Sequence, residues 1–231
     1  MAKQTTMNRQ AALVYISKTY LANQSQSGMQ QVFGKVKAVY AQYQKTGNLS
    51  TMRYLLALCI RARHGRRMPW CDTRTAVDKL LQANLLSQKF SDFEALYKEV
   101  KKQLNGIHFA QGPLTVYDTA LNLGQLFTPA ISPTKTVYLS AGAWDGAVFL
   151  IGKKNVKPTM PTSTWRVSNL FPTLDSMYIE DVLCICKSIF EKLSQGKQVT
   201  QAEVDACLKI CPISLFNESD ALQRMGYVPQ P

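Results

Sequence analysis

Four arginines lie within seven residues of the chain: Arg61, Arg63, Arg66 and Arg67. Guanidinium groups stay charged at physiological pH, and their planar donors match the oxygens of a phosphate. His64 lies among them, as a phosphate donor or as an exposed loop residue. Trp70 follows, where it could stack on a base or on an arginine, or anchor the loop to the core. These residue types at this spacing predict contact with a polyanion.

The positive charge is concentrated in the N-terminal half. Residues 1–110 hold 17 basic and 5 acidic side chains, whereas residues 111–231 hold 10 of each, and the first acidic residue of the chain is Asp72. The helix dipole accounts for one or two cations at the end of a helix. A solvated face normally mixes both signs, because like charges at helical spacing repel. We therefore expect an anionic partner: nucleic acid first, an acidic protein second, and no membrane.

The residues expected to contact nucleic acid extend beyond the arginine cluster. Lys35 and Lys37 lie off the apolar stripe of their helix and lengthen the basic track. Gly112 precedes Pro113, so a helix beginning there would direct free backbone N–H groups and a positive dipole end outward. The full set is Lys35, Lys37, Arg61, Arg63, His64, Arg66, Arg67, Trp70 and Gly112.

Residues 104–124, LNGIHFAQGPLTVYDTALNLG, contain two glycines between two helical patterns. The segment resembles helix-hairpin-helix DNA-binding modules, in which an apolar-Gly-Ile-Gly turn joins two helices, although HFAQ intervenes before the second glycine. The matching positions are Leu104, Gly106, Ile107, Gly112, Pro113 and Ala120. The resemblance implies two helices joined by a turn that contacts phosphate. VYDTALNLG and VYLSAG also resemble segments of uncharacterised bacterial proteins, which implies a bacterial cytoplasmic protein.

An enzymatic role has two candidate residues, Asp118 and Tyr117. Helix-hairpin-helix glycosylases carry an essential aspartate in a context that Val116-Tyr117-Asp118 resembles, which implies base-excision chemistry with Asp118 as electrostatic stabiliser and Tyr117 at the pocket wall. The sequence lacks the catalytic lysine of that family and the cysteine spacing that holds its iron–sulfur cluster. The alternative is that Asp118 pairs with an arginine or occupies the first turns of a helix.

Other catalytic and metal signatures are weak. Two histidines, His64 and His108, leave little from which to assemble a triad or a histidine metal site. Residues 142–146, GAWDG, lack the lysine that ends a phosphate loop. The cysteine pairs 184/186 and 207/211 lie in helical patterns rather than zinc knuckles, so we expect buried thiols. We expect a binding protein rather than an enzyme, without metal or cofactor.

Apolar periodicity predicts a mainly helical chain. The expected helices cover 6–21, 28–45, 51–63, 74–86, 91–104, one from Pro113, 178–194, 200–211 and 219–225. Ser50 or Thr51, Ser91 with Glu94, and Thr200 with Glu203 are the expected N-terminal caps. A short strand is expected near 136–140, a glycine-rich turn after it, and a long ordered loop over 152–175.

The fold class is therefore a compact multi-helix domain with a minor β element. A length of 231 residues suits a single domain, with a basic helical half over 1–110 and a neutral half over 111–231. No apolar run reaches the length that crosses a bilayer, and the N-terminus lacks a secretory signal. The expected protein is cytoplasmic and binds phosphates without strong base preference, so its affinity should fall steeply with salt.

Overall fold

The computed structural model describes residues 6–63, 67–209 and 216–227, and it confirms a mainly α-helical chain with short two-stranded sheets. The chain forms two compact units, Met1–Ser27 with Pro133–Cys211 and Gly28–Ser132 with Pro212–Pro231. The sequence predicted one domain with a basic and a neutral half. Each unit joins segments that are distant in the sequence: residues 9–22 pack against 201–209 in one unit, and residues 218–224 pack against 49–61 in the other.

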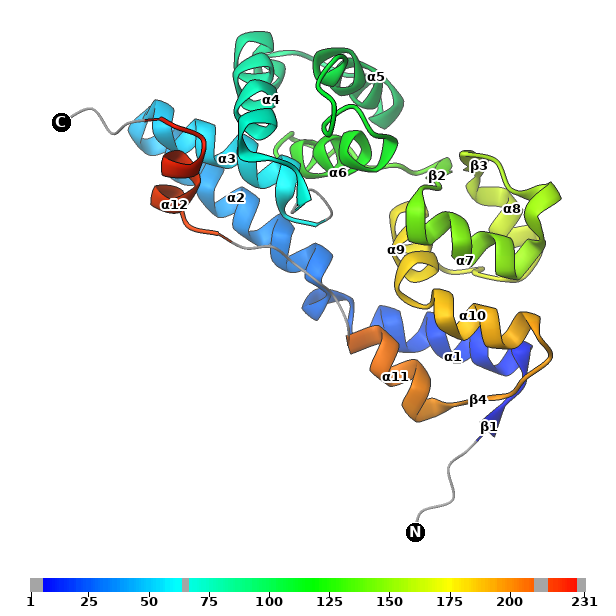
Figure 1. Ribbon diagram of the computed structural model, residues 1–231. Helices are drawn as coiled ribbons and strands as arrows, with labels where there is room; N and C mark the ends of the chain where they lie inside the picture. Colours follow the sequence, from blue (N-terminus) through cyan, green and yellow to red (C-terminus); the bar gives the residue numbers. More distant parts are fainter. Residues whose placement is uncertain (1–5, 64–66, 210–215, 228–231) are drawn as a thin grey trace. The chain divides into compact units, whose positions relative to one another are not determined.

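The unit that begins at Gly28 is entirely helical in its described residues (Figure 1). Its helices are α2 (Gly28–Thr46), α3 (Leu49–Arg61), α4 (Trp70–Ala83), the short 3-10 helix η3 (Leu85–Ser87), α5 (Phe93–Leu104), α6 (Pro113–Gly124) and α12 (Glu218–Arg224). Helix α3 is the centre of this unit, since it packs against α2, α4, α6 and α12. Every residue of α3 from Tyr54 to Arg61 is buried, which explains its nearly continuous apolar sequence.

Two of the predicted N-terminal caps are wrong by one to three residues. Helix α3 is capped by Asn48, whose side chain accepts a hydrogen bond from Ser50 N at 2.8 Å. Helix α5 is capped by Asp92, which accepts from Ala95 N at 2.9 Å. Asn and Asp compete equally with Ser as caps, so composition alone could not choose among neighbours.

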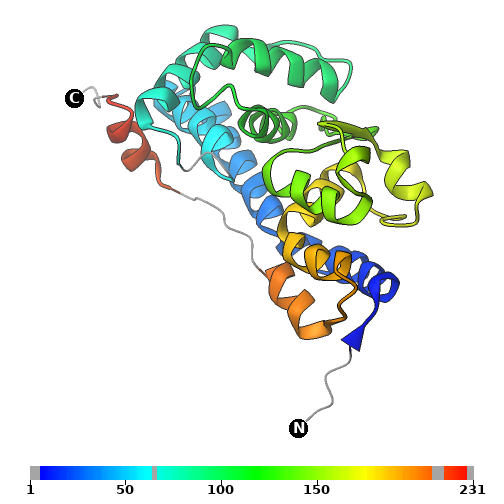
Figure 2. The same ribbon diagram turned by 45° about the vertical axis from the view of Figure 1, so that its right-hand side comes forward.

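The other unit combines helices with two small sheets. Its elements are β1 (Thr6–Met7), α1 (Arg9–Ala22), η1 (Gln24–Gln26), β2 (Thr136–Tyr138), α7 (Ala141–Ile151), η4 (Lys153–Asn155), β3 (Thr159–Pro161), α8 (Thr162–Val167), α9 (Ser176–Ile185), α10 (Lys187–Ser194), β4 (Val199–Thr200) and α11 (Gln201–Lys209). Strand β1 pairs antiparallel with β4, and β2 with β3. Figure 2, like Figure 1, shows α11 beside α1, where the two ends of this unit meet.

The predicted glycine-rich turn after β2 is wrong, because residues 141–151 form helix α7. Glycine at 142 and 146 lets α7 approach α9 closely. A Cβ at Gly146 would lie 2.1 Å from the carbonyl oxygen of Leu183, and one at Gly142 would lie 2.8 Å from Cys184 Sγ. These glycines therefore serve helix packing rather than a turn.

The segment 152–175 and the helix predicted at 178–194 also differ from expectation. The expected long loop contains η4, β3 and α8, and β3 completes the sheet with β2 through the pair Val137 and Met160. The predicted single helix is two, α9 and α10, which meet at Cys186. By contrast, the predicted Thr200–Glu203 capping box is confirmed, with Thr200 N donating to Glu203 Oε2 at 2.7 Å and Glu203 N to Thr200 Oγ1 at 3.2 Å.

Candidate polyanion-binding surface

Arg61 lies at the C-terminal end of α3 and is buried, with 4% of its surface exposed. Its Nη1 donates to the carbonyl oxygen of Met68 and, at 2.8 Å, to Thr73 Oγ1. Its guanidinium lies 3.9 Å from the centre of the Trp70 ring. Burial lowers the pKa of Arg61, and the nearby Arg224 charge lowers it further. Arg61 thus ties the start of α4 to the end of α3 and is not available to a phosphate.

Arg63 is also buried, with 3% exposed, and its Nη1 donates to Asp118 Oδ1 at 3.0 Å. Asp118 lies in α6 and is 1% exposed. A buried guanidinium without a counter-charge would be costly, and the carboxylate compensates it. The alternative that Asp118 pairs with an arginine is confirmed.

The structure therefore contradicts the prediction that Arg61 and Arg63 contact phosphate. Charge counted along the sequence treated both as uncompensated, but Asp118 lies 55 residues beyond Arg63. Trp70 is occupied as well, because Phe216 packs edge-on against its ring with centroids 5.5 Å apart, in addition to Arg61. The reading of Trp70 as an anchor of this loop fits that packing.

Of the remaining residues of the arginine cluster, one is described by the structure and two are not. Arg67 is exposed to solvent in the segment between α3 and α4. His64 and Arg66, predicted to bind phosphate with it, lie outside the described residues.

Helix α2 carries the exposed cations that the sequence predicted on this helix. Lys35 and Lys37 are exposed, as is Lys45, which the predicted site did not include. Helix α2 contains no acidic residue, and no carboxylate in the described part of the chain forms an ion pair with these three lysines. Lys35 Nζ lies 6.0 Å from the centre of the Tyr54 ring.

The unit that contains α2 has a positive net charge, as α2 itself has. The sequence of Gly28–Ser132 and Pro212–Pro231 carries 15 Lys and Arg residues and 8 Asp and Glu residues. Several exposed cations elsewhere in the unit are paired, such as Lys98 with Glu94 at 3.5 Å and Lys102 with Glu99 at 3.2 Å. The lysines of α2 differ from these because they lack such carboxylate neighbours.

The N-terminus of α6 begins at Pro113, as predicted, and Gly112 is its cap without a side-chain hydrogen bond. Gly112 has φ −62°, so its conformation does not require glycine, and a Cβ there would meet nothing within 4 Å. Gly106 has φ +80°, a left-handed conformation that favours glycine. Gly112 therefore has no packing reason to lack a side chain.

Helices α5 and α6 pack against each other across the loop 105–112. Within that loop Ile107 and Ala110 are buried, and Gly106 N donates to Gln111 Oε1 at 3.2 Å. These contacts do not test whether the segment belongs to the helix-hairpin-helix family, so that resemblance stays a prediction.

The catalytic alternative placed Asp118 and Tyr117 in a substrate pocket. Both side chains are buried, Asp118 against Arg63 and Tyr117 with its ring 5.8 Å from that of Phe93. A carboxylate held in an internal ion pair is not presented to a substrate. The geometry assigns Asp118 a structural role and does not favour base-excision chemistry.

The described residues contain no group of three or more His, Cys, Asp or Glu side chains arranged to hold a metal ion. Five cysteines are described, and all are free: Cys59, Cys71, Cys184, Cys186 and Cys207. Burial raises the pKa of the Cys59 and Cys186 thiols well above the usual range. Cys211, considered as a fourth ligand, lies outside the described residues.

In the part of the chain that the structure describes, no helix combines the length and the apolar character needed to cross a bilayer. No protein-family model matches the chain, and comparisons with curated proteins and with solved structures find no significant match.

Proposed function

We propose that this chain binds nucleic acid through its phosphate backbone, with the lysines of α2 at the centre of the contact. The observation that supports the proposal is the exposure of Lys35, Lys37 and Lys45 on a helix that contains no acidic residue. Phosphate contacts position a protein on nucleic acid without reading its sequence, so weak base preference is expected.

The spacing of the three lysines suits a rod-like or flexible polyanion. At about 100° per residue, Lys45 lies between Lys35 and Lys37 around the helix axis. Lys45 lies opposite the buried stripe that contains Val32 and Val36, and Lys35 and Lys37 lie on the two sides of the helix that flank this stripe.

Arg67 extends the expected contact, since it is exposed and belongs to the same unit. With Arg61 and Arg63 buried, the proposal involves about three or four phosphates. The logarithm of the binding constant for duplex DNA should then fall with the logarithm of salt concentration with a slope of about −3 to −4.

The test compares two triple variants with the same change of charge. Lys35→Gln/Lys37→Gln/Lys45→Gln removes the α2 cations, whereas Lys98→Gln/Lys101→Gln/Lys102→Gln removes three exposed cations of α5, two of them already paired with glutamates. Fluorescence anisotropy with duplex and single-stranded probes measures affinity across a salt series. The slope of the logarithm of the binding constant against the logarithm of salt concentration should become less negative by about 2 to 3 in the α2 variant. In the α5 variant it should change by less than about 1.

Equal losses in the two variants would mean that only net charge matters, and the α2 contact would be rejected. A wild-type protein that binds neither probe at low salt would reject nucleic-acid binding altogether. A third result would indicate an acidic protein partner instead. In that case a protein would still co-purify with the wild-type chain after nuclease treatment has removed the material that absorbs at 260 nm, and the α2 variant would no longer retain that protein.

A further inference from the structure

The C-terminal part of α2 extends past the core of its unit. The buried residues of this helix end at Val39, and every residue from 40 to 46 is at least partly exposed. Tyr40 and Tyr43 continue the apolar side of the helix into this part, each four residues after a buried valine. Both tyrosines are only half-buried, so aromatic surface remains open to solvent on the helix that carries the exposed lysines.

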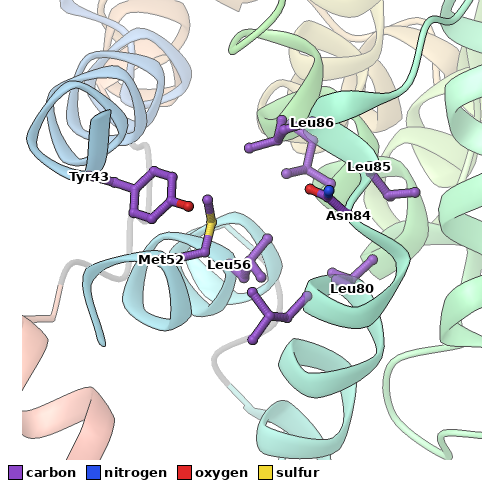
Figure 3. Close-up of a pocket in the computed structure, with 9 residues that line it drawn as sticks. Tyr43, Met52, Leu56, Leu80, Asn84, Leu85 and Leu86 are labelled. Carbon is purple, nitrogen blue, oxygen red and sulfur yellow. The ribbon is translucent and has the colours of Figure 1, made fainter. Parts of the chain in front are cut away.

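The two tyrosine rings form a stacked pair. Their centroids lie 6.4 Å apart, and their planes differ by 18°. Figure 3 shows the Tyr43 ring extending from α2 toward Met52 of α3, whose side chain is buried. Tyr43 and Met52 line the same small pocket, which Tyr40 does not line. Tyr43 is therefore anchored on α3, and the Tyr40 ring is stacked on this anchored neighbour.

Neither ring is committed to an internal hydrogen bond. The Tyr54 hydroxyl of the same unit, by contrast, donates to Phe216 O. No such bond to a described residue holds the hydroxyl of Tyr40 or of Tyr43, and neither hydroxyl is buried. A buried hydroxyl would need a partner, whereas these two reach water. The stacked pair is thus not fixed by the polar contacts that hold a core tyrosine.

A cation lies beside the outer ring of this pair. Lys37 precedes Tyr40 by three residues, and side chains at that spacing are neighbours on the surface of a helix. Lys37 is exposed, and no carboxylate in the described part of the chain forms an ion pair with it. A flat ring beside an unpaired cation matches a nucleotide, whose base presents a flat face close to its own phosphate.

We propose that Tyr40, backed by Tyr43, stacks on an unpaired base of the bound nucleic acid, so that the chain prefers a single strand to a duplex. This inference rests on the function proposed above, because the phosphates of the same strand contact the lysines of α2. Bases in a duplex stack on each other, whereas a single strand can present a base to an aromatic side chain. Every base has such a face, so stacking agrees with weak base preference.

The experiment compares strands with bases and a strand without them. Fluorescence anisotropy measures the affinity of the full chain for oligothymidylate, oligouridylate and an abasic deoxyribose–phosphate strand, each of about 12 nucleotides. The abasic strand keeps the phosphates but offers nothing to stack on Tyr40. Wild type should bind at least one of the strands with bases about five- to thirtyfold more tightly than the abasic strand. Tighter binding of oligothymidylate would identify DNA as the partner, and tighter binding of oligouridylate would identify RNA.

Three variants locate the stacking contact. Tyr40→Leu removes the ring but keeps an apolar side chain, and it should reduce the advantage over the abasic strand to less than about twofold. Its duplex affinity and its salt slope should stay unchanged, since no charge is removed. Tyr40→Phe keeps the ring and should bind as wild type does. Phe109→Leu removes a ring that is 48% exposed outside α2, and it should leave the advantage intact.

Equal affinity of the wild type for all three strands would overturn the stacking proposal, even if Tyr40→Leu did not fold. An undiminished advantage in a folded Tyr40→Leu variant would also overturn it, as would an equal loss in Phe109→Leu. In each of these cases, binding with the expected salt slope would leave the lysine contact of α2 in place. A wild type that binds none of the strands at low salt would instead reject nucleic-acid binding itself, so the two failures are distinguishable.

Discussion

Arg63, two residues after the end of α3, and Asp118 in α6 form an ion pair of 3.0 Å between two side chains that are 3% and 1% exposed. The pair ties the segment after α3 to helix α6 of the same unit, and it neutralises a charge that has no partner nearby in the sequence. A buried pair of this kind adds little net stability over an apolar pair, but losing one member strands the other charge away from water.

Replacing Asp118 alone should therefore destabilise the protein strongly. Asp118→Ala leaves the Arg63 guanidinium buried without its carboxylate, and we expect a loss of about 3 to 5 kcal/mol in the free energy of unfolding. Urea denaturation followed by circular dichroism measures this loss.

The double variant Arg63→Met/Asp118→Leu should recover much of the loss, because no charge remains buried. Glu94→Ala provides the surface control, since its pair with Lys98 is exposed and should contribute less than about 1 kcal/mol. If Asp118→Ala costs no more than Glu94→Ala, the pair does not have the structural role assigned to it.

Alanine at two glycines of the chain should change stability in opposite directions. At Gly146 the new Cβ would lie 2.1 Å from Leu183 O, a backbone atom that cannot move aside cheaply, so Gly146→Ala should cost about 1 to 3 kcal/mol or more. At Gly34, exposed inside α2, a Cβ meets nothing within 4 Å, and Gly34→Ala should stabilise by about 0.5 to 1 kcal/mol. Melting temperatures compare the two, and a Gly146→Ala variant that melts no lower than the wild type would contradict the close packing of α7 on α9.

The contact between Glu203 and Lys192 should make stability depend on pH in the acid range. Lys192 first, and then the Thr200 N–H and hydroxyl, lower the pKa of Glu203 to about 2. Because the folded state favours the carboxylate, this contribution is complete above the ordinary glutamate value of about 4.3 and is lost as the pH falls toward 2.

The difference in melting temperature between wild type and Glu203→Gln should accordingly shrink from pH 6 to pH 2. Glu191→Gln, at an exposed position of α10, corrects for the general effect of removing a carboxylate. A wild-type advantage that persists unchanged at pH 2 would show that the charge of Glu203 is not its source.

The cysteines should react with thiol reagents in an order set by burial. Burial raises the pKa of the Cys59 and Cys186 thiols, which disfavours the reactive thiolate, whereas Cys71 is exposed. Native protein treated with iodoacetamide and mapped by mass spectrometry should be labelled at Cys71 well before Cys59. Labelling of Cys59 at the rate of Cys71 would mean that the α3 core opens readily.

The local sequence pattern was enough to predict much of the helical structure and the exposed lysines of the candidate site. Apolar periodicity located α1, α2 and α3 and placed Lys35 and Lys37 toward solvent, because the face of a helix follows from residue spacing alone. The Thr200–Glu203 capping box was equally readable, since both partners lie within one turn.

Only the tertiary structure decided which arginines of the cluster are buried and what the glycines of α7 do. Arg63 is buried because Asp118 meets it from another helix, and Gly146 serves packing because α9 returns to cover it. Such contacts join residues far apart in the chain. Charge or composition counted along the sequence does not indicate which distant segment packs against a given residue. Only the folded chain could therefore show that Arg61 and Arg63 are buried.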